Sequence, residues 1–399
     1  MTQISVKTSW LPGPPQILEN LGSATVFLRD GKLLVGHGEA LRISAKGPNR
    51  IQELSAKWRE LVQAATIDDE VQLPGSGLVA FSSITFSPQS NYESVLIVPE
   101  ELFVVRGDQA WKTTFETGHH RESENSGGYE SQFRAGEMSA QKFKSSVEEA
   151  ITKIRSSQIE KVVVARDLVL TTDENPDLST VISKLHARYP HCWTYFVNGN
   201  FGASPELLIR SSAGEVSARV LAGTAARGTD PDVDRAISEG LLHSIKNTHE
   251  HKYAVDSLIK KLEPFCDAVE ADEKPFSLAL PDLFHLATDV TGHLKSSTTL
   301  LDVVAELHPT AAVAGTPREA AMQLISELEP FDRGGYAGPV GWIAADGSGE
   351  LAIALRGGRI EEKQIRAFAG CGIVAESEPQ AELDETELKF KAVRWAFES

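Results

Sequence analysis

The sequence is poor in cysteine and has no long apolar stretch. Its three cysteines, Cys192, Cys266 and Cys371, are scattered over 399 residues without CxxC spacing, which argues against a disulfide framework and against a zinc site. No apolar run approaches the roughly 18 residues of a membrane-spanning helix, and the N-terminal residues lack the basic and apolar regions of a signal peptide. We therefore expect a cytoplasmic protein that has no membrane partner.

Basic residues are also in short supply. The chain carries 39 Lys and Arg against 56 Asp and Glu, which gives a formal net charge of −17 at pH 7. A nucleic-acid-binding protein needs a basic surface to replace the counterions of its ligand, so this balance argues against a nucleic-acid partner. It does not exclude a small anionic substrate, because a pocket can be locally positive in an acidic protein.

Common nucleotide-binding motifs are missing as well. No GxxxxGK[ST] loop occurs, and no dinucleotide fingerprint follows a strand. What is present is a series of short strand-like segments joined by hairpin signals, such as the RDG turn at residues 29–31. Hairpin connections favour antiparallel sheets, so we predict an α+β fold with helices outside mostly antiparallel sheets. Helical periodicity covers residues 48–65, 140–156, 178–187, 249–262, 300–307 and 318–328.

The sequence changes character in its polar segment 117–138, which is rich in Gly and Ser and predicts a flexible loop. Residues 1–116 before it predict a strand-rich scaffold without an arrangement of catalytic residue types. Residues 139–399 after it carry the candidate motifs. We expect one domain over 1–399 that contains these three portions.

Residues 366–391 combine a glycine turn with a charged helix. Gly370 and Gly372 follow a β-branched run, and we expect a turn there that exposes backbone N–H groups. Beyond it, Glu382, Glu385 and Lys389 fall at i, i+3 and i+7 on one helix face. Such a set could hold a divalent cation beside an anion, or it could be an ordinary solvated face near a chain end. The spacing alone leaves both interpretations open.

Nine motif blocks follow one another in the second part of the chain. Together they resemble the chorismate-utilising enzymes, the group of isochorismate synthases, salicylate synthases and the large components of anthranilate and aminodeoxychorismate synthases. The resemblance covers residues 139–397 and implies a fold like the anthranilate synthase large component, a sandwich of two mostly antiparallel sheets. The blocks are KVVVARD (161–167), SPELLI (204–209), LAGTAARG (221–228), THEHKYAVD (248–256), HLATDVTGHL (285–294), HPTAAVAGTP (308–317), DRGGYAGPVGW (332–342), AIALRGGRI (352–360) and AGCGIVAESEPQAELDET (369–386).

The resemblance implies chorismate as substrate, a cyclohexadiene with two carboxylates, and Mg²⁺ as cofactor. Glu250 and Glu385 match the family's metal ligands, and Glu382 matches a partner that acts through water. Hard carboxylate oxygens suit Mg²⁺, which would hold the ring carboxylate. Lys161 matches the base that activates water in isochorismate and salicylate synthases, and Glu206 matches the acid that protonates the departing C4 hydroxyl.

The remaining implied site residues contact the substrate. Arg356 can fork a carboxylate, while His285 is either a helper near the substrate or a core histidine. The full set implied for substrate binding is Gly223, Thr224, His285, Ala312, Tyr336, Arg356, Gly370, Gly372 and Lys389.

Single positions distinguish the related activities. Aminating relatives carry Gln where this chain has Lys161, and covalent aminodeoxychorismate synthases carry a nucleophilic Lys at the position of Ala222. Ala312 matches isochorismate synthases, whereas lyase-active relatives tend to have Thr. Two departures from the family motifs are Val220 and Ala311, which both replace Pro.

We therefore predict a monomeric isochorismate synthase without a glutaminase subunit. A salicylate synthase, which also eliminates pyruvate, is the alternative. A non-catalytic anion- or metal-binding protein on the same scaffold would have lost the base or the acid, and both are present. The sequence does not indicate whether the product enters menaquinone or siderophore synthesis.

Overall fold

The computed structural model describes residues 5–19, 21–22, 24–115, 132–156, 159–295 and 298–397. Within these ranges the side chains of residues 246, 249 and 250 also lie outside the description. Residues 117–131 of the expected flexible loop are not among the described residues. The end of that segment is described, and Arg134–Ala135 (β10) pairs with the strand that begins at Lys161, so this part is a sheet edge instead of a loop.

The larger of two sheets contains thirteen strands in the described part of the chain. Its pairings are antiparallel except for β1 with β5. In spatial order the strands are β10, β11 (Lys161–Thr171), β23 (Gln364–Ile373), β22 (Gly357–Glu361), β13 (Asn200–Ser204), β12 (Trp193–Val197), β2 (Thr25–Arg29), β3 (Lys32–His37), β8 (Glu101–Arg106), β9 (Gln109–Phe115), β1 (Ser5–Trp10) and β5 (Thr66–Asp69), with β19 (Gly315–Thr316) beside β11.

The second sheet contains ten strands in the described ranges, and all their pairings are antiparallel. Its spatial order is β16 (Cys266–Ala271), β18 (Leu283–Leu294), β15 (Glu215–Ala226), β14 (Leu207–Ser212), β21 (Gly349–Ile353), β20 (Pro339–Ala344), β6 (Val79–Ser83), β7 (Ser94–Val98) and β4 (Leu41–Ala45), with β17 (Phe276–Ala279) beside β18.

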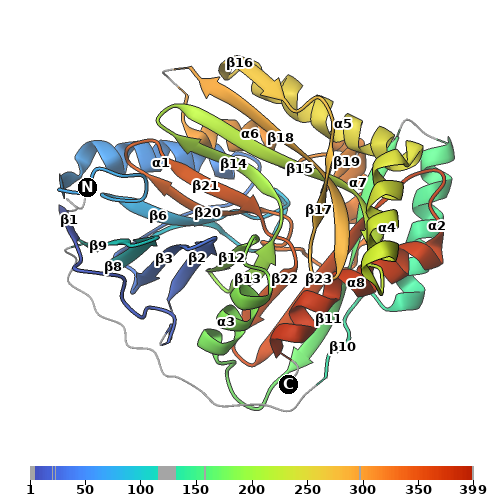
Figure 1. The fold of residues 1–399 in the computed structure, drawn as a ribbon, viewed down its shortest axis with the longest axis horizontal. Coiled ribbons are helices and arrows are strands. Elements are labelled where there is room, and N and C mark those ends of the chain that lie inside the picture. Colours follow the sequence, from blue (N-terminus) through green and yellow to red (C-terminus); the bar gives the residue numbers. More distant parts are fainter. Residues whose placement is uncertain are drawn as a thin grey trace.

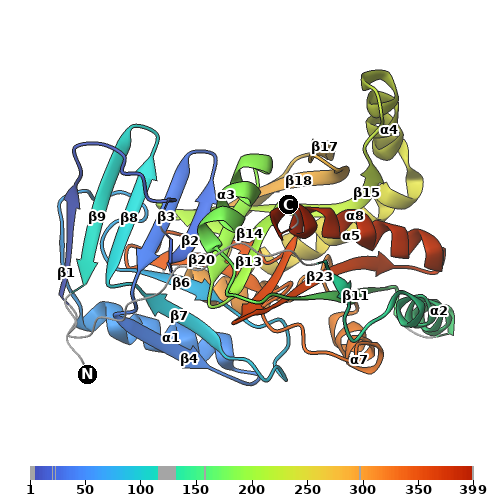
Figure 2. The ribbon, with the colours of Figure 1, turned by 90° about the horizontal axis from the view of Figure 1, so that it is seen from below.

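Helices cover the sheets from outside, as Figures 1 and 2 show. The C-terminal helix packs on β23 and against two other helices, and the helix over 245–262 packs on β15. None of the helices in the described ranges combines the length and the apolar composition that crossing a bilayer requires. The helices are α1 (Arg50–Ala64), α2 (Ala140–Ser156), α3 (Leu178–Arg188), α4 (Pro231–His243), α5 (Ile245–Leu262), α6 (Leu300–Leu307), α7 (Arg318–Leu328) and α8 (Pro379–Phe397).

Both sheets contain strands from both ends of the chain. In the larger sheet β12 pairs with β2, with Thr194 opposite Leu28. In the second sheet β20 pairs with β6, with Val340 opposite Ser83. The N-terminal third is therefore joined to the rest by continuous hydrogen-bonded ladders, which Figure 2 shows as blue strands beside green and orange ones.

The fold class predicted from hairpins and periodicity is confirmed as α+β with two mostly antiparallel sheets. The core between sheets and helices contains fully buried aromatic side chains such as Trp111, Trp193 and Phe143. On α8 an apolar stripe is buried, formed by Leu383, Phe390, Val393 and Phe397, with Phe390 fully enclosed. This stripe fixes which face of α8 turns its charged residues toward the interior.

The turn expected at Gly370 and Gly372 is wrong. Both glycines lie inside β23, where Gly370 is opposite Ala165 and Gly372 opposite Val163 of β11. The close approach of the two strands favours glycine at position 370, since a Cβ there would lie 3.1 Å from the carbonyl oxygen of Val164.

Candidate active site

One cavity of about 280 Å³ lies where the two sheets meet α5 and α8. It collects every predicted site residue except Glu250, whose side chain is outside the description. The predicted residues that line it are Lys161, Glu206, Gly223, Thr224, His285, Ala312, Tyr336, Arg356, Gly370, Gly372, Glu382, Glu385 and Lys389.

Glu206 lies in the turn between β13 and β14 and is 5% exposed. The preceding Ser204 hydroxyl accepts a hydrogen bond from the Glu206 backbone N–H at 3.2 Å, which fixes the turn. Burial raises the pKa of the Glu206 carboxyl to about 8, although the charges of Lys161 and Arg356 and the backbone N–H of Leu221 act in the opposite direction. The carboxyl therefore carries a proton at neutral pH and can donate it.

Lys161 begins β11 and lies opposite Thr316 of β19. Its side chain lines the same cavity as Glu206, and the residue is only 9% exposed. The lysine is therefore part of the cavity wall, and its positive charge acts on the Glu206 carboxyl.

His285 on β18 is held by hydrogen bonds at both ring nitrogens. Nδ1 lies 3.2 Å from the Gly223 carbonyl oxygen and 3.1 Å from the Thr224 hydroxyl, and Nε2 lies next to Nη2 of Arg356. A carbonyl oxygen can only accept, so Nδ1 carries the proton and Nε2 accepts from the guanidinium. Burial, together with the charges of Arg356 and Lys389, places the pKa of His285 well below its usual value, which keeps the ring neutral. His285 is therefore buried and hydrogen-bonded, as a core histidine would be, and it also lines the cavity.

Thr224 and Gly223 lie at an irregularity of β15. The register with β18 shifts between Leu221 and Thr224, which is the pattern of a β-bulge. Gly223 has a φ of +85°, a conformation that favours glycine. The bulge turns the Gly223 carbonyl toward His285, and β15 is interrupted at this position.

Arg356 follows β21 and is buried, with a left-handed φ of +52° that is uncommon for a residue with a side chain. The next residue must be glycine, because a Cβ at Gly357 would lie 1.8 Å from the carbonyl oxygen of Phe201. Only Nη2 of the guanidinium has a partner, whereas Nε and Nη1 are buried without a hydrogen bond in the described structure. Arg356 lines the cavity and its guanidinium keeps unpaired N–H groups there, so it can bind a carboxylate.

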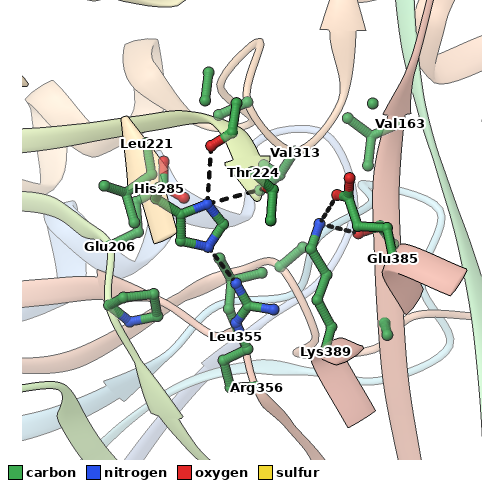
Figure 3. A pocket seen from close by; sticks show the side chains of 18 of the residues that line it. Val163, Glu206, Leu221, Thr224, His285, Val313, Leu355, Arg356, Glu385 and Lys389 are labelled. Carbon is green, nitrogen blue, oxygen red and sulfur yellow. Dashed lines mark hydrogen bonds and ion pairs between the residues drawn. The ribbon is translucent and has the colours of Figure 1, made fainter. Parts of the chain in front are cut away.

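Helix α8 brings the predicted charged face to the opposite wall of the cavity (Figure 3). The Lys389 ammonium is 2.6 Å from a carboxylate oxygen of Glu385 and donates to the Gly370 carbonyl oxygen at 2.7 Å. Glu382, one turn earlier, is 7% exposed. The Gly370 carbonyl oxygen thus accepts a hydrogen bond from Lys389. The turn with exposed backbone N–H groups that the sequence predicts here is not found, because Gly370 lies within β23.

The carboxylates of α8 fit a hard divalent cation by chemistry. Glu382 and Glu385 line the cavity from one helix face, and carboxylate oxygens are the ligands that Mg²⁺ prefers. Among the described residues no group of three His, Cys, Asp or Glu is placed to hold a metal ion. Glu250 is not among those residues, because its side chain is not described. On α5 it comes three residues after Asn247, which lines the cavity.

Among the cavity residues that were not predicted, three have polar or aromatic side chains: Asn247, Phe368 and Arg333. Asn247 precedes position 250 by one helical turn, and that spacing was a usable signal. Phe368 stacks on Tyr336 with ring centroids 5.1 Å apart, and no local pattern indicates that pairing. Burial raises the pKa of Tyr336 to about 12, so its hydroxyl remains a donor.

Arg333 is the third, and it is structural. Its guanidinium forms a buried ion pair with Glu329 and donates to the carbonyl oxygens of Val313 at 3.0 Å and Val163 at 2.9 Å. Glu329 in turn accepts from the backbone N–H of Ala165 at 2.8 Å. The pair therefore joins the end of α7 to β11 and to the loop at Val313, and the strand and the loop both line the cavity. The i, i+4 spacing of Glu329 and Arg333 was visible in the sequence.

Comparison with known proteins gives consistent results. Isochorismate synthase DhbC of Bacillus subtilis is 32% identical over 361 residues, which cover 88% of this chain and 87% of that protein. Isochorismate synthase MenF of Bacillus subtilis is 38% identical over 261 residues, 64% of this chain but only 55% of the length of that protein. The structure of MenF, the menaquinone-specific isochorismate synthase from Escherichia coli, has a TM-score of 0.82 at 21% identity, covering 99% of this chain and 95% of the other, and supports the fold.

The family profile described as chorismate binding enzyme matches residues 16–122 and 104–398, and so nearly the whole chain. These matches confirm the resemblance that the nine motif blocks indicate. The chain belongs to the chorismate binding enzyme family.

Proposed function

We propose that the protein is an isochorismate synthase of the cytoplasm that isomerises chorismate reversibly to isochorismate. The observation that carries the proposal is the protonated Glu206 carboxyl, with a pKa of about 8, in one cavity with Lys161 and Arg356. The reaction adds water at one ring carbon and removes a hydroxyl group from another. It needs a base for the water, an acid for the departing hydroxyl and a partner for the substrate carboxylate. The resemblance to isochorismate synthases supports the same reaction.

The proposed reaction uses Lys161 and Glu206 as a complementary pair. The Lys161 amine takes a proton from water, and the water oxygen bonds to C2 of the ring while the double bonds shift. The C4–O bond breaks, and Glu206 gives its proton to the departing hydroxyl, which leaves as water. Both groups line the cavity, so that a ring bound there would meet each of them.

The substrate carboxylates have natural partners in the cavity. Nε and Nη1 of Arg356 are the unpaired donors, and the bond from Nη2 to His285 holds the guanidinium plane in place. Tyr336 can add a hydroxyl donor from the same wall. A bound carboxylate would relieve the cost of leaving two buried donors unpaired.

Glu250, Glu385 and Glu382 would hold Mg²⁺. When bound, the ion would supply Lewis-acid polarisation and charge neutralisation for the ring carboxylate. Glu385 is the residue that must change partner, because its oxygen is paired with Lys389 at 2.6 Å. Lys389, once released from Glu385, keeps the Gly370 carbonyl as a partner.

The residue at position 161 also bears on partners. Lysine favours water over ammonia as nucleophile, so we propose that the enzyme works without a glutaminase subunit and as a monomer. Ala312 lines the cavity where lyase-active relatives have Thr, which supports release of isochorismate before any elimination of pyruvate.

The test measures turnover and binding separately. With Mg²⁺ the wild-type protein should consume chorismate, and excess EDTA should stop it. Lys161→Gln and Glu206→Gln should each reduce kcat about 1,000-fold while calorimetry shows chorismate binding within about threefold of wild type. Substitution of the exposed Lys153, Lys153→Gln, is the matched control. A Lys161→Gln variant with full activity would remove the proposed base.

A further inference from the structure

A second, smaller cavity adjoins the candidate active site. It has a volume of about 20 Å³, which is room for one water molecule, and Glu206 and Ala312 line it as well as the main cavity. Its other walls come from β14, β15 and β21, from the C-terminal half of α5 and from the loop after α6. Glu206 therefore borders two cavities, the substrate cavity and this one.

Thr310 supplies a polar group without a partner to this cavity. The residue follows α6, and its Oγ1 is buried without a hydrogen bond in the described structure. A buried hydroxyl without a partner is costly, and a water molecule in the small cavity would satisfy it. The hydroxyl can accept a proton from one neighbour while it donates to another.

Lys261 lines the same cavity from the last turn of α5 and is partly exposed, so it connects the cavity with solvent. Burial and the neighbouring charge of Arg318 lower its pKa to about 8, against the opposite effect of Glu306. Arg219 also lines the cavity but is held by a bidentate ion pair with Asp289 at 2.6 Å. Lys261 is thus the lining cation that can exchange a proton near neutral pH.

The geometry points to a proton path, in which Lys261, one water molecule in the small cavity and the Thr310 hydroxyl return a proton to Glu206 after each turnover. This inference rests on the proposed function. One turnover leaves Lys161 with an extra proton and Glu206 without one. The path returns one proton from solvent to Glu206, and Lys161 releases its proton to solvent, so the cycle balances without any co-reactant.

Two features of the chain support a specific role for this cavity. Val220 and Ala311, where the family motifs have Pro, both line it. The substrate cavity would be filled by substrate or product, whereas the small cavity reaches Glu206 without crossing it. A path of this kind would let Glu206 be reprotonated while the main cavity is occupied.

The test separates the first turnover from the following ones. Resting Glu206 already carries its proton, so Thr310→Val should convert the first equivalent of chorismate at the wild-type rate in rapid-quench experiments. The steady-state rate should then fall about tenfold, which gives a burst of one product per active site. Thr310→Ser keeps the hydroxyl and should show no burst. Lys261→Met should reproduce the burst, and Lys260→Met, at the exposed neighbour, should not.

The contrary results are equally clear. Equal slowing of the first and later turnovers in Thr310→Val would mean a structural effect, and an unchanged steady-state rate would mean that Glu206 is reprotonated through the main cavity; either overturns the path. Failure of the proposed function is distinguishable, because the wild-type protein would then not convert chorismate at all.

Discussion

Arg356 donates a hydrogen bond from Nη2 to Nε2 of His285, while its Nε and Nη1 are buried without a partner among the described residues. The neutral ring of His285 makes this possible, since its Nδ1–H is directed to the Gly223 carbonyl oxygen. The arrangement orients two free donors without neutralising the guanidinium. A carboxylate ligand is the group that this geometry favours.

Arg356→Lys should weaken chorismate binding. Lysine keeps the charge but cannot offer two parallel donors, and hydrogen bonds to charged groups contribute about 1.5–3 kcal/mol each. KM should rise roughly tenfold to a hundredfold, measured by initial rates over a range of chorismate concentrations. Arg359→Lys, at a residue paired with Glu361 outside the cavity, should leave KM unchanged. An unchanged KM in Arg356→Lys would show that Arg356 does not bind a carboxylate of chorismate.

His285 should stay neutral throughout the working pH range. Its pKa is lowered by burial and by two nearby cations, Arg356 and Lys389. Nitrogen-15 NMR of labelled histidine should show the Nδ1–H tautomer from pH 8 down to pH 5.5, without a charged form. The exposed His191 provides an internal comparison in the same spectra. A charged His285 ring at pH 6 would contradict the assigned hydrogen bonds.

Glu206→Gln should change how stability depends on pH. Because the pKa of Glu206 is raised from 4.5 to about 8, the folded wild type binds more protons than the unfolded chain between these values, and its unfolding free energy falls as pH rises. Glutamine does not titrate, so the variant should gain roughly 4 kcal/mol on wild type between pH 5 and pH 8.5. Urea unfolding at several pH values measures this gain. The exposed Glu60→Gln is the control, and parallel curves for Glu206→Gln and wild type would contradict the buried acid.

Arg333→Met should destabilise the fold. The substitution leaves Glu329 buried beside β11 without its partner, and both side chains are only 2% exposed. Breaking a buried pair in this way costs about 3–5 kcal/mol. Arg235→Met, which removes an exposed pair with Asp232, should cost less than about 1 kcal/mol. Equal urea midpoints for Arg333→Met and wild type would show that the pair does not support this wall.

Local patterns predict much of this structure, and long-range pairing accounts for the rest. The periodic apolar stripes of α2, α6 and α7 predict their bounds as observed. Helix α4 was missed because it buries only Leu241, although Asp230 as N-cap followed by Pro231 was a start signal. The glycines of β23 predicted a turn, because their pairing with β11, two hundred residues earlier, leaves no local trace.

The site divides in the same way. The helical spacing of Glu382, Glu385 and Lys389 predicts a shared face, and α8 presents that face to the cavity. Spacing could not show that Lys389 pairs with Glu385 or that Arg356 has left-handed backbone geometry. Those features depend on which strands and helices meet, and this is determined by the whole core.

The most direct test of the central claim follows the oxygen of the product. Chorismate is incubated with the protein and Mg²⁺ in ¹⁸O-labelled water, and the products are examined by mass spectrometry and NMR. The account predicts isochorismate with one labelled oxygen at C2 and no pyruvate. Unlabelled isochorismate, or salicylate with an equal amount of pyruvate, would contradict it.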